Sequence, residues 1–217
     1  MRYELAIFDM DGTILDTLSD LTDSMNYCLQ QYNMPLKTLE QIRSYVGNGI
    51  HRLIERAVPG GLDSTLVEEM YLLFKDYYKD HCAIKTKPYD GICGVIATLR
   101  DEGIKTAVVS NKADFAVKSL CMDYFDGLFD YSVGDKEGMR IKPYPDGVNE
   151  VINYFDIPRK KCVYIGDSDV DFQTAKNAAI DVIMVGWGFR DEEFLHSIGA
   201  KDVIHTPEEI ITIVKGR

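Results

Sequence analysis

Four short runs of hydrophobic residues, each about the length of a strand, alternate with segments of helical pattern. The runs are almost continuously apolar and lie at 5–8, 106–109, 162–165 and 182–185. Such runs are typical of strands buried on both faces of a parallel sheet. Segments with helical patterns separate them, at 94–101, 114–122, 145–155 and 169–178. This alternation predicts an α/β fold with a doubly wound, mostly parallel, Rossmann-like sheet.

One interval is far longer than a connection between neighbouring strands requires. A crossover needs about 30 residues including its helix, and the segment 94–101 already supplies that helix. Inside the surplus, apolar residues recur at helical spacing, as at Leu18, Leu21, Met25 and Leu29. We therefore predict that residues 16–83 form an inserted all-helical cap domain. Two crossings would join it to an α/β core domain made of residues 1–15 and 84–217.

The composition of the chain argues against several classes of binding partner. The chain of 217 residues has 24 Lys+Arg against 35 Asp+Glu, a net charge of −11, which argues against nucleic acids and anionic membranes. No apolar run approaches the roughly 20 residues that span a bilayer, and the first residues lack a signal-peptide pattern, so we expect a cytoplasmic protein. The five cysteines show no C-x-x-C spacing and predict neither a disulfide framework nor a zinc site. A monomer and a homodimer both remain open.

Carboxylates follow two of the predicted strands. Asp9 and Asp11 follow the first run, and Asp167 and Asp171 follow the third. Any one of them could be a helix cap, but the carboxyl ends of parallel strands meet at one edge, so we expect the group to lie together. Clustered carboxylates repel one another unless a cation neutralises them, and an all-oxygen set suits Mg²⁺. The candidate metal ligands are therefore Asp9, Asp11, Asp167 and Asp171.

Other polar residues at this edge indicate phosphoryl transfer. The second run ends in Ser110-Asn111-Lys112, and Lys142 precedes a predicted helix. An aspartate can attack phosphorus to give an aspartyl phosphate, while a neighbouring aspartate serves as acid and then base. Gly12 permits a tight turn that directs backbone amides at phosphoryl oxygens. The candidate substrate-binding residues here are Gly12, Thr13, Asn111 and Lys112, although Lys112 could equally pair with a carboxylate.

In this order, the motifs resemble those of the haloacid dehalogenase superfamily, in the branch whose helical cap lies between the first and second motifs. The similar segments are Asp9-x-Asp11-Gly12-Thr13, Ser110, Lys142 and Gly166-Asp167-Ser168-x-x-Asp171. The resemblance implies that Asp9 is the nucleophile and a Mg²⁺ ligand. It also implies that Asp11 is the acid/base and binds Mg²⁺ through its main-chain carbonyl.

The same resemblance implies roles for the remaining motif residues. Asp167 would be the third protein ligand of the metal, Ser110 would hold the phosphoryl group, and Lys142 would neutralise charge on nucleophile and phosphate. Asp171 would order Lys142 or a metal-bound water. The chain departs from the superfamily's pattern at residues 178–180, Ala-Ala-Ile, where the helix usually ends in Ala-Gly. That departure brings the end of the helix into question but leaves the chemistry unchanged.

Within the superfamily the chain most resembles the phosphoglycolate phosphatase group. The similar segments are 44–49, 110–112, 142–145 and 186–190. This implies a Mg²⁺-dependent phosphatase for a small phosphate monoester. A pyrophosphatase, a nucleotidase and a phosphosugar mutase remain alternatives on the same scaffold, and a non-catalytic phosphate-binding module is a further one. In the cap, Arg43, Gly47 and Asn48 are the candidates for contacting the leaving group of the substrate.

Overall fold

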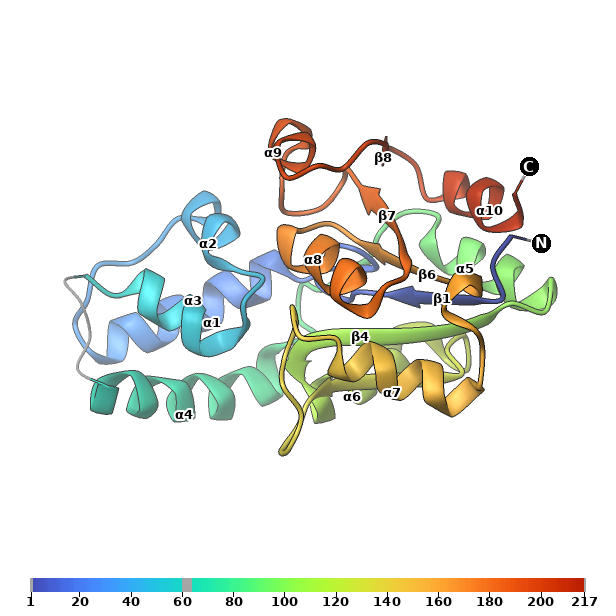
Figure 1. Cartoon of the computed structure of the whole chain (residues 1–217). Helices are drawn as coiled ribbons and strands as arrows, with labels where there is room; N and C mark the ends of the chain where they lie inside the picture. Colours follow the sequence, from blue (N-terminus) through green and yellow to red (C-terminus); the bar gives the residue numbers. More distant parts are fainter. Residues whose placement is uncertain (1, 60–63, 217) are drawn as a thin grey trace. The chain divides into compact units, whose positions relative to one another are not determined.

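The computed structural model describes residues 2–59 and 64–216, and the chain divides into two compact units (Figure 1). The core unit comprises Met1–Leu15 and Pro88–Arg217, and the insert unit comprises Asp16–Lys87. On the return side, the boundary between the two units lies between Lys87 and Pro88. Within the insert unit, Asp20 in the first helix accepts hydrogen bonds from the backbone N–H groups of Lys85 and Thr86. The two linkers, β2 (Leu15–Asp16) and β3 (Lys87–Pro88), pair as a two-stranded sheet.

The core unit is built on a six-stranded sheet in the order β5-β4-β1-β6-β7-β8. Its strands are β1 (Leu5–Phe8), β4 (Lys105–Ala113), β5 (Tyr131–Asp135), β6 (Cys162–Gly166), β7 (Asp181–Val185) and β8 (Val203–Ile204). Each neighbouring pair is parallel, which confirms the predicted α/β class. The register places Phe8 beside both Val108 and Ile165. Residues that follow these three positions therefore emerge at one edge of the sheet.

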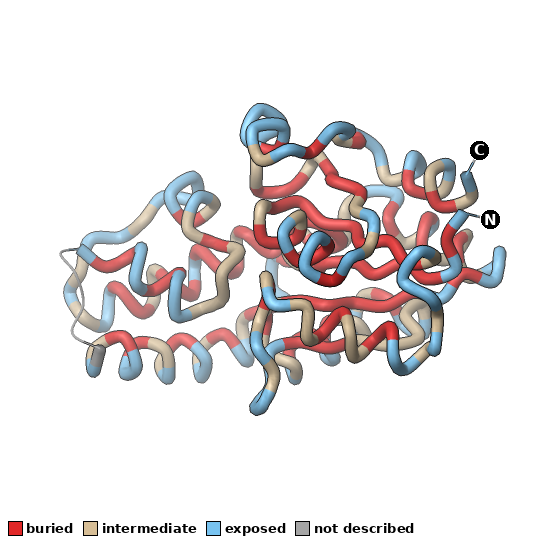
Figure 2. Tube along the Cα trace, viewed as in Figure 1, coloured by how far each residue is buried: buried red, intermediate tan, exposed pale blue. Residues whose placement is uncertain are grey.

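Helices cover both faces of this sheet (Figure 1). They are α5 (Ile92–Asp101), α6 (Asp114–Phe125), α7 (Asp146–Phe155), α8 (Asp169–Ala178), α9 (Glu192–Ser197) and α10 (Glu208–Lys215), with a 3-10 turn at Arg159–Lys161. Leu5 and Ile7 of β1 pack into one cluster with apolar residues of α7 and α8. The rings of Phe8 and Phe129 pack edge to face with their centroids 5.9 Å apart, and the ring of Phe129 packs in the same way against Phe125 of α6. Figure 2 shows the buried residues concentrated along the strands.

Helix α8 ends where the sequence departs from the superfamily's pattern. Ala179 caps the helix in the left-handed region, with φ 53° and ψ 46°, and its N–H donates to the carbonyls of Ala175 and Lys176. An alanine thus occupies a conformation that favours glycine. The cap forms in spite of the departure.

The insert unit is helical, as predicted. Its helices are α1 (Leu18–Gln31), α2 (Leu39–Tyr45), α3 (Gly49–Ala57) and α4 (Ser64–His81). Helix α1 packs against α2 and α4, and α3 packs against α2 and α4. Their apolar faces bury Met25, Leu29, Ile54 and Phe74 completely. Throughout the described ranges, every helix is too short or too polar to cross a membrane.

Candidate active site

Three adjacent strands of the core unit deliver polar residues to one edge of the sheet. Asp9 follows β1, and its N–H donates to the carbonyl of Ile165 at 2.9 Å. Asp167 follows β6, and Asp171 lies in the first turn of α8. The pairing of β4 with β5 shifts register between Val109 and Ala113. The segment from Ser110 to Lys112 therefore lies in the irregular end of β4, where side chains are no longer set by the ladder.

Asp9, Asp167 and Asp171 form a buried carboxylate cluster. One oxygen from each lies within 4.8 Å of the others. The ammonium of Lys142 is 2.7 Å from Asp9 Oδ1 and 2.7 Å from Asp171 Oδ1, and it donates to the Tyr164 hydroxyl at 3.1 Å. Two of the three carboxylates, Asp9 and Asp171, therefore pair with the same buried lysine.

Asp167 is held by groups from two loops. Its carboxylate accepts a hydrogen bond from Thr13 Oγ1 at 3.1 Å and another from the Phe189 N–H at 2.7 Å. Two glycines leave room for it: a Cβ on Gly12, which has φ +84°, would lie 2.4 Å from Asp167 Oδ2, and one on Gly188 would lie 2.3 Å from Asp167 Cβ. Thr13, a candidate for substrate binding, therefore places its buried hydroxyl on a carboxylate of the cluster.

Asp171 is fixed at the start of α8 by a capping box. Its Oδ2 accepts from the Ser168 N–H at 3.1 Å and from the Ser168 hydroxyl at 2.6 Å. Its Oδ1 accepts from Lys142. The Tyr164 hydroxyl donates to the Val109 carbonyl at 2.9 Å, so its oxygen accepts from Lys142 in a fixed position. Asp171 and Tyr164 together orient the ammonium toward Asp9.

Negative charge exceeds positive charge in the carboxylate cluster. Burial, followed by the charge of Asp171, raises the pKa of Asp9 well above its ordinary value. The same two causes raise the pKa of Asp167 to about 7. Burial alone would lower the pKa of Lys142, but Asp171 and Asp9 outweigh it and raise that pKa well above its usual range. The lysine therefore stays charged, and the carboxylates lack sufficient positive charge to match them.

These residues fit a hard divalent cation. Asp9 Oδ1 is buried and has the ion pair with Lys142 but no hydrogen bond of good geometry. The donors are all carboxylate oxygens, the set that hard cations prefer. A bound cation would supply the charge that Lys142 alone does not. Asp9, Asp167 and Asp171 are the side chains placed to hold it.

The Asp11 carboxylate lies outside this cluster and pairs with Lys112. Lys112 Nζ is 3.1 Å from Asp11 Oδ1, and the lysine side chain is only 3% exposed, against 22% for Asp11. Lys112 therefore pairs with a carboxylate, and a contact between Lys112 and the substrate stays a prediction. Asp11 is the more exposed member of this pair.

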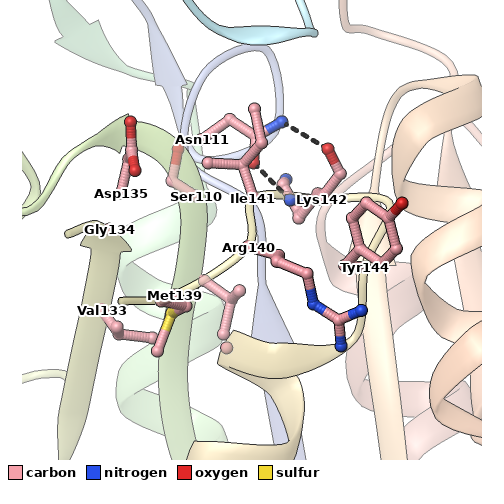
Figure 3. Close-up of a pocket in the computed structure, with 12 residues that line it drawn as sticks. Ser110, Asn111, Val133, Gly134, Asp135, Met139, Arg140, Ile141, Lys142 and Tyr144 are labelled. Atoms are coloured by element: carbon pink, nitrogen blue, oxygen red, sulfur yellow. Dashed lines mark hydrogen bonds between the residues drawn. The ribbon is translucent and has the colours of Figure 1, made fainter. Parts of the chain in front are cut away.

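Ser110 and Asn111 line a small cavity beside Lys142 (Figure 3). The Ser110 hydroxyl accepts from the N–H of Lys112 at 3.3 Å. Asn111, a candidate for substrate binding, makes two hydrogen bonds from its side chain to the backbone of Lys142. Ser110, Asn111 and Lys142 therefore all line the same cavity.

The cap candidates belong to the insert unit. Arg43 lies in the last turn of α2, Gly47 has φ 115°, and Asn48 precedes α3. Arg56, which the sequence did not single out, donates to Asn48 Oδ1 at 2.8 Å and to the Tyr45 carbonyl at 2.7 Å. Arg56 therefore stabilises both ends of the loop between α2 and α3 through these two hydrogen bonds.

Sequence reasoning also missed Tyr164, Gly188 and Phe189. Tyr164 stands in an apolar run, where it looks like an ordinary core residue. Gly188 and Phe189 belong to the Gly-Trp-Gly-Phe segment at 186–189, whose two glycines were a usable signal of close packing. The Trp187 indole N–H donates to the Thr13 carbonyl at 3.1 Å, which ties this segment to the loop after β1.

Comparisons with known proteins agree with this geometry. The model of a family described as haloacid dehalogenase-like hydrolase matches residues 6–185. A phosphoglycolate phosphatase from Mesorhizobium japonicum is 32% identical over 197 residues, which cover 88% of this chain and 86% of the relative. A protein from Caldanaerobacter subterraneus, named as a pyrophosphatase by prediction, is 28% identical over 217 residues, which cover 100% of this chain and 96% of that protein.

A crystal structure from Lactobacillus delbrueckii subsp. bulgaricus superimposes with a TM-score of 0.94. Its sequence is 41% identical to this chain, and the match covers 99% of each chain. The activity in its name, phosphoglycolate phosphatase, is itself a prediction. Fold, order of motifs and arrangement of the carboxylates all point to one family.

Proposed function

Because this chain belongs to the haloacid dehalogenase-like hydrolases, we propose that it is a Mg²⁺-dependent phosphatase that hydrolyses a small phosphate monoester through an aspartyl phosphate on Asp9. One observation carries the proposal. The Asp9 carboxylate lies buried at the end of the central strand, 2.7 Å from the Lys142 ammonium and within 4.8 Å of two further carboxylates. Burying several carboxylates together costs stability, and groups perturbed by burial and by like charges cluster at functional sites.

The proposed reaction has two steps on Asp9, with Asp11 as the proton carrier. In the first, a carboxylate oxygen of Asp9 forms a bond to phosphorus, the bond from phosphorus to the ester oxygen breaks, and Asp11 donates a proton to the departing alkoxide. In the second, Asp11 takes a proton from water, the water oxygen bonds to phosphorus, and the bond to Asp9 breaks. Inorganic phosphate leaves, and both aspartates return to their starting states.

Lys142, Ser110 and the metal site provide the charge stabilisation. Lys142 neutralises charge on Asp9 and on the phosphoryl oxygens, and Ser110 donates a hydrogen bond to the phosphoryl group. When bound at Asp9, Asp167 and Asp171, Mg²⁺ would neutralise phosphoryl charge and orient the group for in-line attack. The backbone carbonyl of Asp11 would be a further ligand. Gly12 and Thr13 would present their backbone amides to the phosphoryl oxygens.

Phosphoglycolate, or a similarly small ester with an anionic leaving group, is the proposed substrate. The relative from Mesorhizobium japonicum carries this activity in its name. A pyrophosphatase is the second candidate, because the relative from Caldanaerobacter subterraneus is named as one and matches the whole chain. Both reactions use the same phosphoryl-transfer residues and differ only in the leaving group.

Phosphate release from a panel of esters tests the proposal. We expect Mg²⁺-dependent turnover that disappears in excess chelator, with phosphoglycolate turned over faster than pyrophosphate, nucleoside monophosphates or hexose phosphates. Asp9→Asn should abolish turnover while the protein stays folded, because the amide cannot attack phosphorus. Asp169→Asn is the matched control, since its side chain is 41% exposed at the start of α8. Near-normal turnover by a folded Asp9→Asn variant would refute the mechanism.

Selection of the leaving group is proposed for the insert unit, because the residues of the core unit act on the phosphoryl group that all esters share. Arg43→Ala or Asn48→Ala should lower kcat/KM for the preferred ester about tenfold, or about 1.4 kcal/mol, and change hydrolysis of an activated aryl phosphate much less. Arg56→Ala should act like Asn48→Ala, because Arg56 holds that loop. Arg52→Ala, on the same helix but paired with Glu55, is the control. Equal losses on both esters would assign these residues to folding of the insert instead.

A further inference from the structure

Lys142 reaches the carboxylate cluster from a segment without regular structure. It lies in the connection between β5 and α7, where the chain forms turns rather than a helix or strand. Its ammonium must nevertheless be held within hydrogen-bonding distance of Asp9, Asp171 and Tyr164. A lysine side chain is flexible because its four-carbon stem rotates about several single bonds. Holding the ammonium in one place is therefore easier when the backbone of Lys142 is itself fixed.

The fixing group is the side chain of Asn111. Its Oδ1 accepts from the Lys142 N–H at 2.7 Å, and its Nδ2 donates to the Lys142 carbonyl at 3.0 Å (Figure 3). The two residues are 31 positions apart, and Asn111 comes from the irregular end of β4. Both backbone groups of Lys142 are thus paired by one side chain, in the way that a neighbouring strand would pair them.

We propose that Asn111 is a positioning residue that acts through Lys142, rather than a residue that binds substrate. The inference rests on the proposed function, in which Lys142 neutralises charge on Asp9 and the phosphoryl group. The primary amide of asparagine carries an NH₂ donor group and an oxygen acceptor in a single plane, so it can pair with both backbone groups. Aspartate keeps the acceptor and loses the donor, and alanine loses both.

The surrounding contacts provide a matched control. Asn177 of α8 donates from Nδ2 to the Pro143 carbonyl at 2.8 Å and is exposed. It also anchors the connection between β5 and α7, one residue after Lys142, but it touches neither backbone group of the lysine. A general loosening of this connection would follow from either asparagine, whereas misplacement of the ammonium should follow from Asn111 alone.

A double-mutant cycle on the full-length protein tests the inference, with an activated aryl phosphate and saturating Mg²⁺. We expect Asn111→Ala to lower kcat at least tenfold with KM changed less than threefold, and Asn111→Asp not to restore it. In a Lys142→Met background, Asn111→Ala should change kcat less than twofold, because the group it positions is already gone. Asn177→Ala should retain the wild-type kcat.

Three results would overturn the inference. Equal fold losses from Asn111→Ala in both backgrounds would show that Asn111 acts independently of Lys142. A raised KM with unchanged kcat would assign it to substrate binding. A large loss in Lys142→Met with none in Asn111→Ala would leave the proposed function intact and remove only the positioning role, whereas wild-type rates in Lys142→Met would contradict the proposed function itself.

A binding measurement covers variants whose turnover is too slow to compare. Beryllium fluoride with Mg²⁺ mimics a phosphorylated aspartate, and its binding is read as a rise in Tm. We expect the full rise in Asn177→Ala and a reduced rise in both Lys142→Met and Asn111→Ala. A full rise in Asn111→Ala beside a reduced one in Lys142→Met would overturn the inference.

Discussion

Replacing Asp167 by asparagine should stabilise the metal-free protein at neutral and alkaline pH. Burial and the neighbouring Asp171 raise the pKa of Asp167 from its ordinary 3.8 to about 7. The amide keeps the shape of the side chain and removes its charge. Its oxygen can accept from the Phe189 N–H, as the carboxylate does. Its NH₂ can donate to Thr13 Oγ1, which keeps the second contact with the direction of the hydrogen bond reversed.

The raised pKa fixes both the sign and the size of the effect. Between pH 3.8 and about 7 the folded protein holds a proton that the unfolded chain has released. The contribution to stability is therefore complete below pH 3.8 and is lost as pH rises through about 7. At about 1.4 kcal/mol per pKa unit, the total loss is about 4 kcal/mol, of which about 3 kcal/mol falls between pH 5 and pH 8.

Urea denaturation in excess chelator from pH 5 to pH 8 measures this difference. The wild type should lose about 3 kcal/mol relative to Asp167→Asn over that range, while Asp169→Asn should follow the wild type because its carboxylate is 41% exposed. Mg²⁺ should reverse the order at pH 8, since the ion binds the ionised carboxylate and the amide binds it poorly. Parallel curves for the wild type and Asp167→Asn in chelator would refute the electrostatic account of the cluster.

Three further substitutions test the packing and the caps. Gly188→Ala should weaken the affinity for Mg²⁺ at least tenfold, measured by calorimetry, because the new Cβ would displace Asp167. Gly94→Ala is the control, since a Cβ at this position would meet nothing within 4 Å. Equal affinities in the two variants would show that close packing of Gly188 against Asp167 does not matter for binding of the metal. Ala179→Gly should raise stability to urea by about 0.5–1 kcal/mol by relieving the left-handed φ of 53°, and a loss would refute that strain. Asp20→Ala should lower it by about 1–3 kcal/mol, since the Lys85 and Thr86 N–H groups lose their acceptor; an unchanged midpoint would count against this.

The parts of the fold that could be predicted are those where burial produces a recognisable pattern of apolar residues along the sequence. Strands β1 and β6 are buried along their whole length, so each is a continuous apolar run. Strand β5, Tyr-Ser-Val-Gly-Asp at the edge of the sheet, is only partly buried and has no such run. Strand β8 has two residues, too few for any pattern. Helices α9 and α10 are short, and no predicted strand followed them to complete the alternation.

The candidate site divides in the same way. Carboxylates that directly follow strands could be placed together, because the strand ends of a parallel sheet share an edge. The partners of those carboxylates depend on loops that no period describes. The pairing of Asn111 with the Lys142 backbone, and of the Phe189 N–H with Asp167, joins segments 31 and 22 residues apart through irregular backbone.

The central position of β1 has a consequence for synthesis of the chain. This strand is made first, yet its sheet neighbours β4 and β6 begin only at residues 105 and 162. At about 5–20 residues per second, translation from β1 to the end of β6 takes roughly 8–30 s. The four helices of the insert are contiguous and complete well before then. The apolar segment Leu5–Phe8 is therefore without its two sheet neighbours until β4 and β6 have been made.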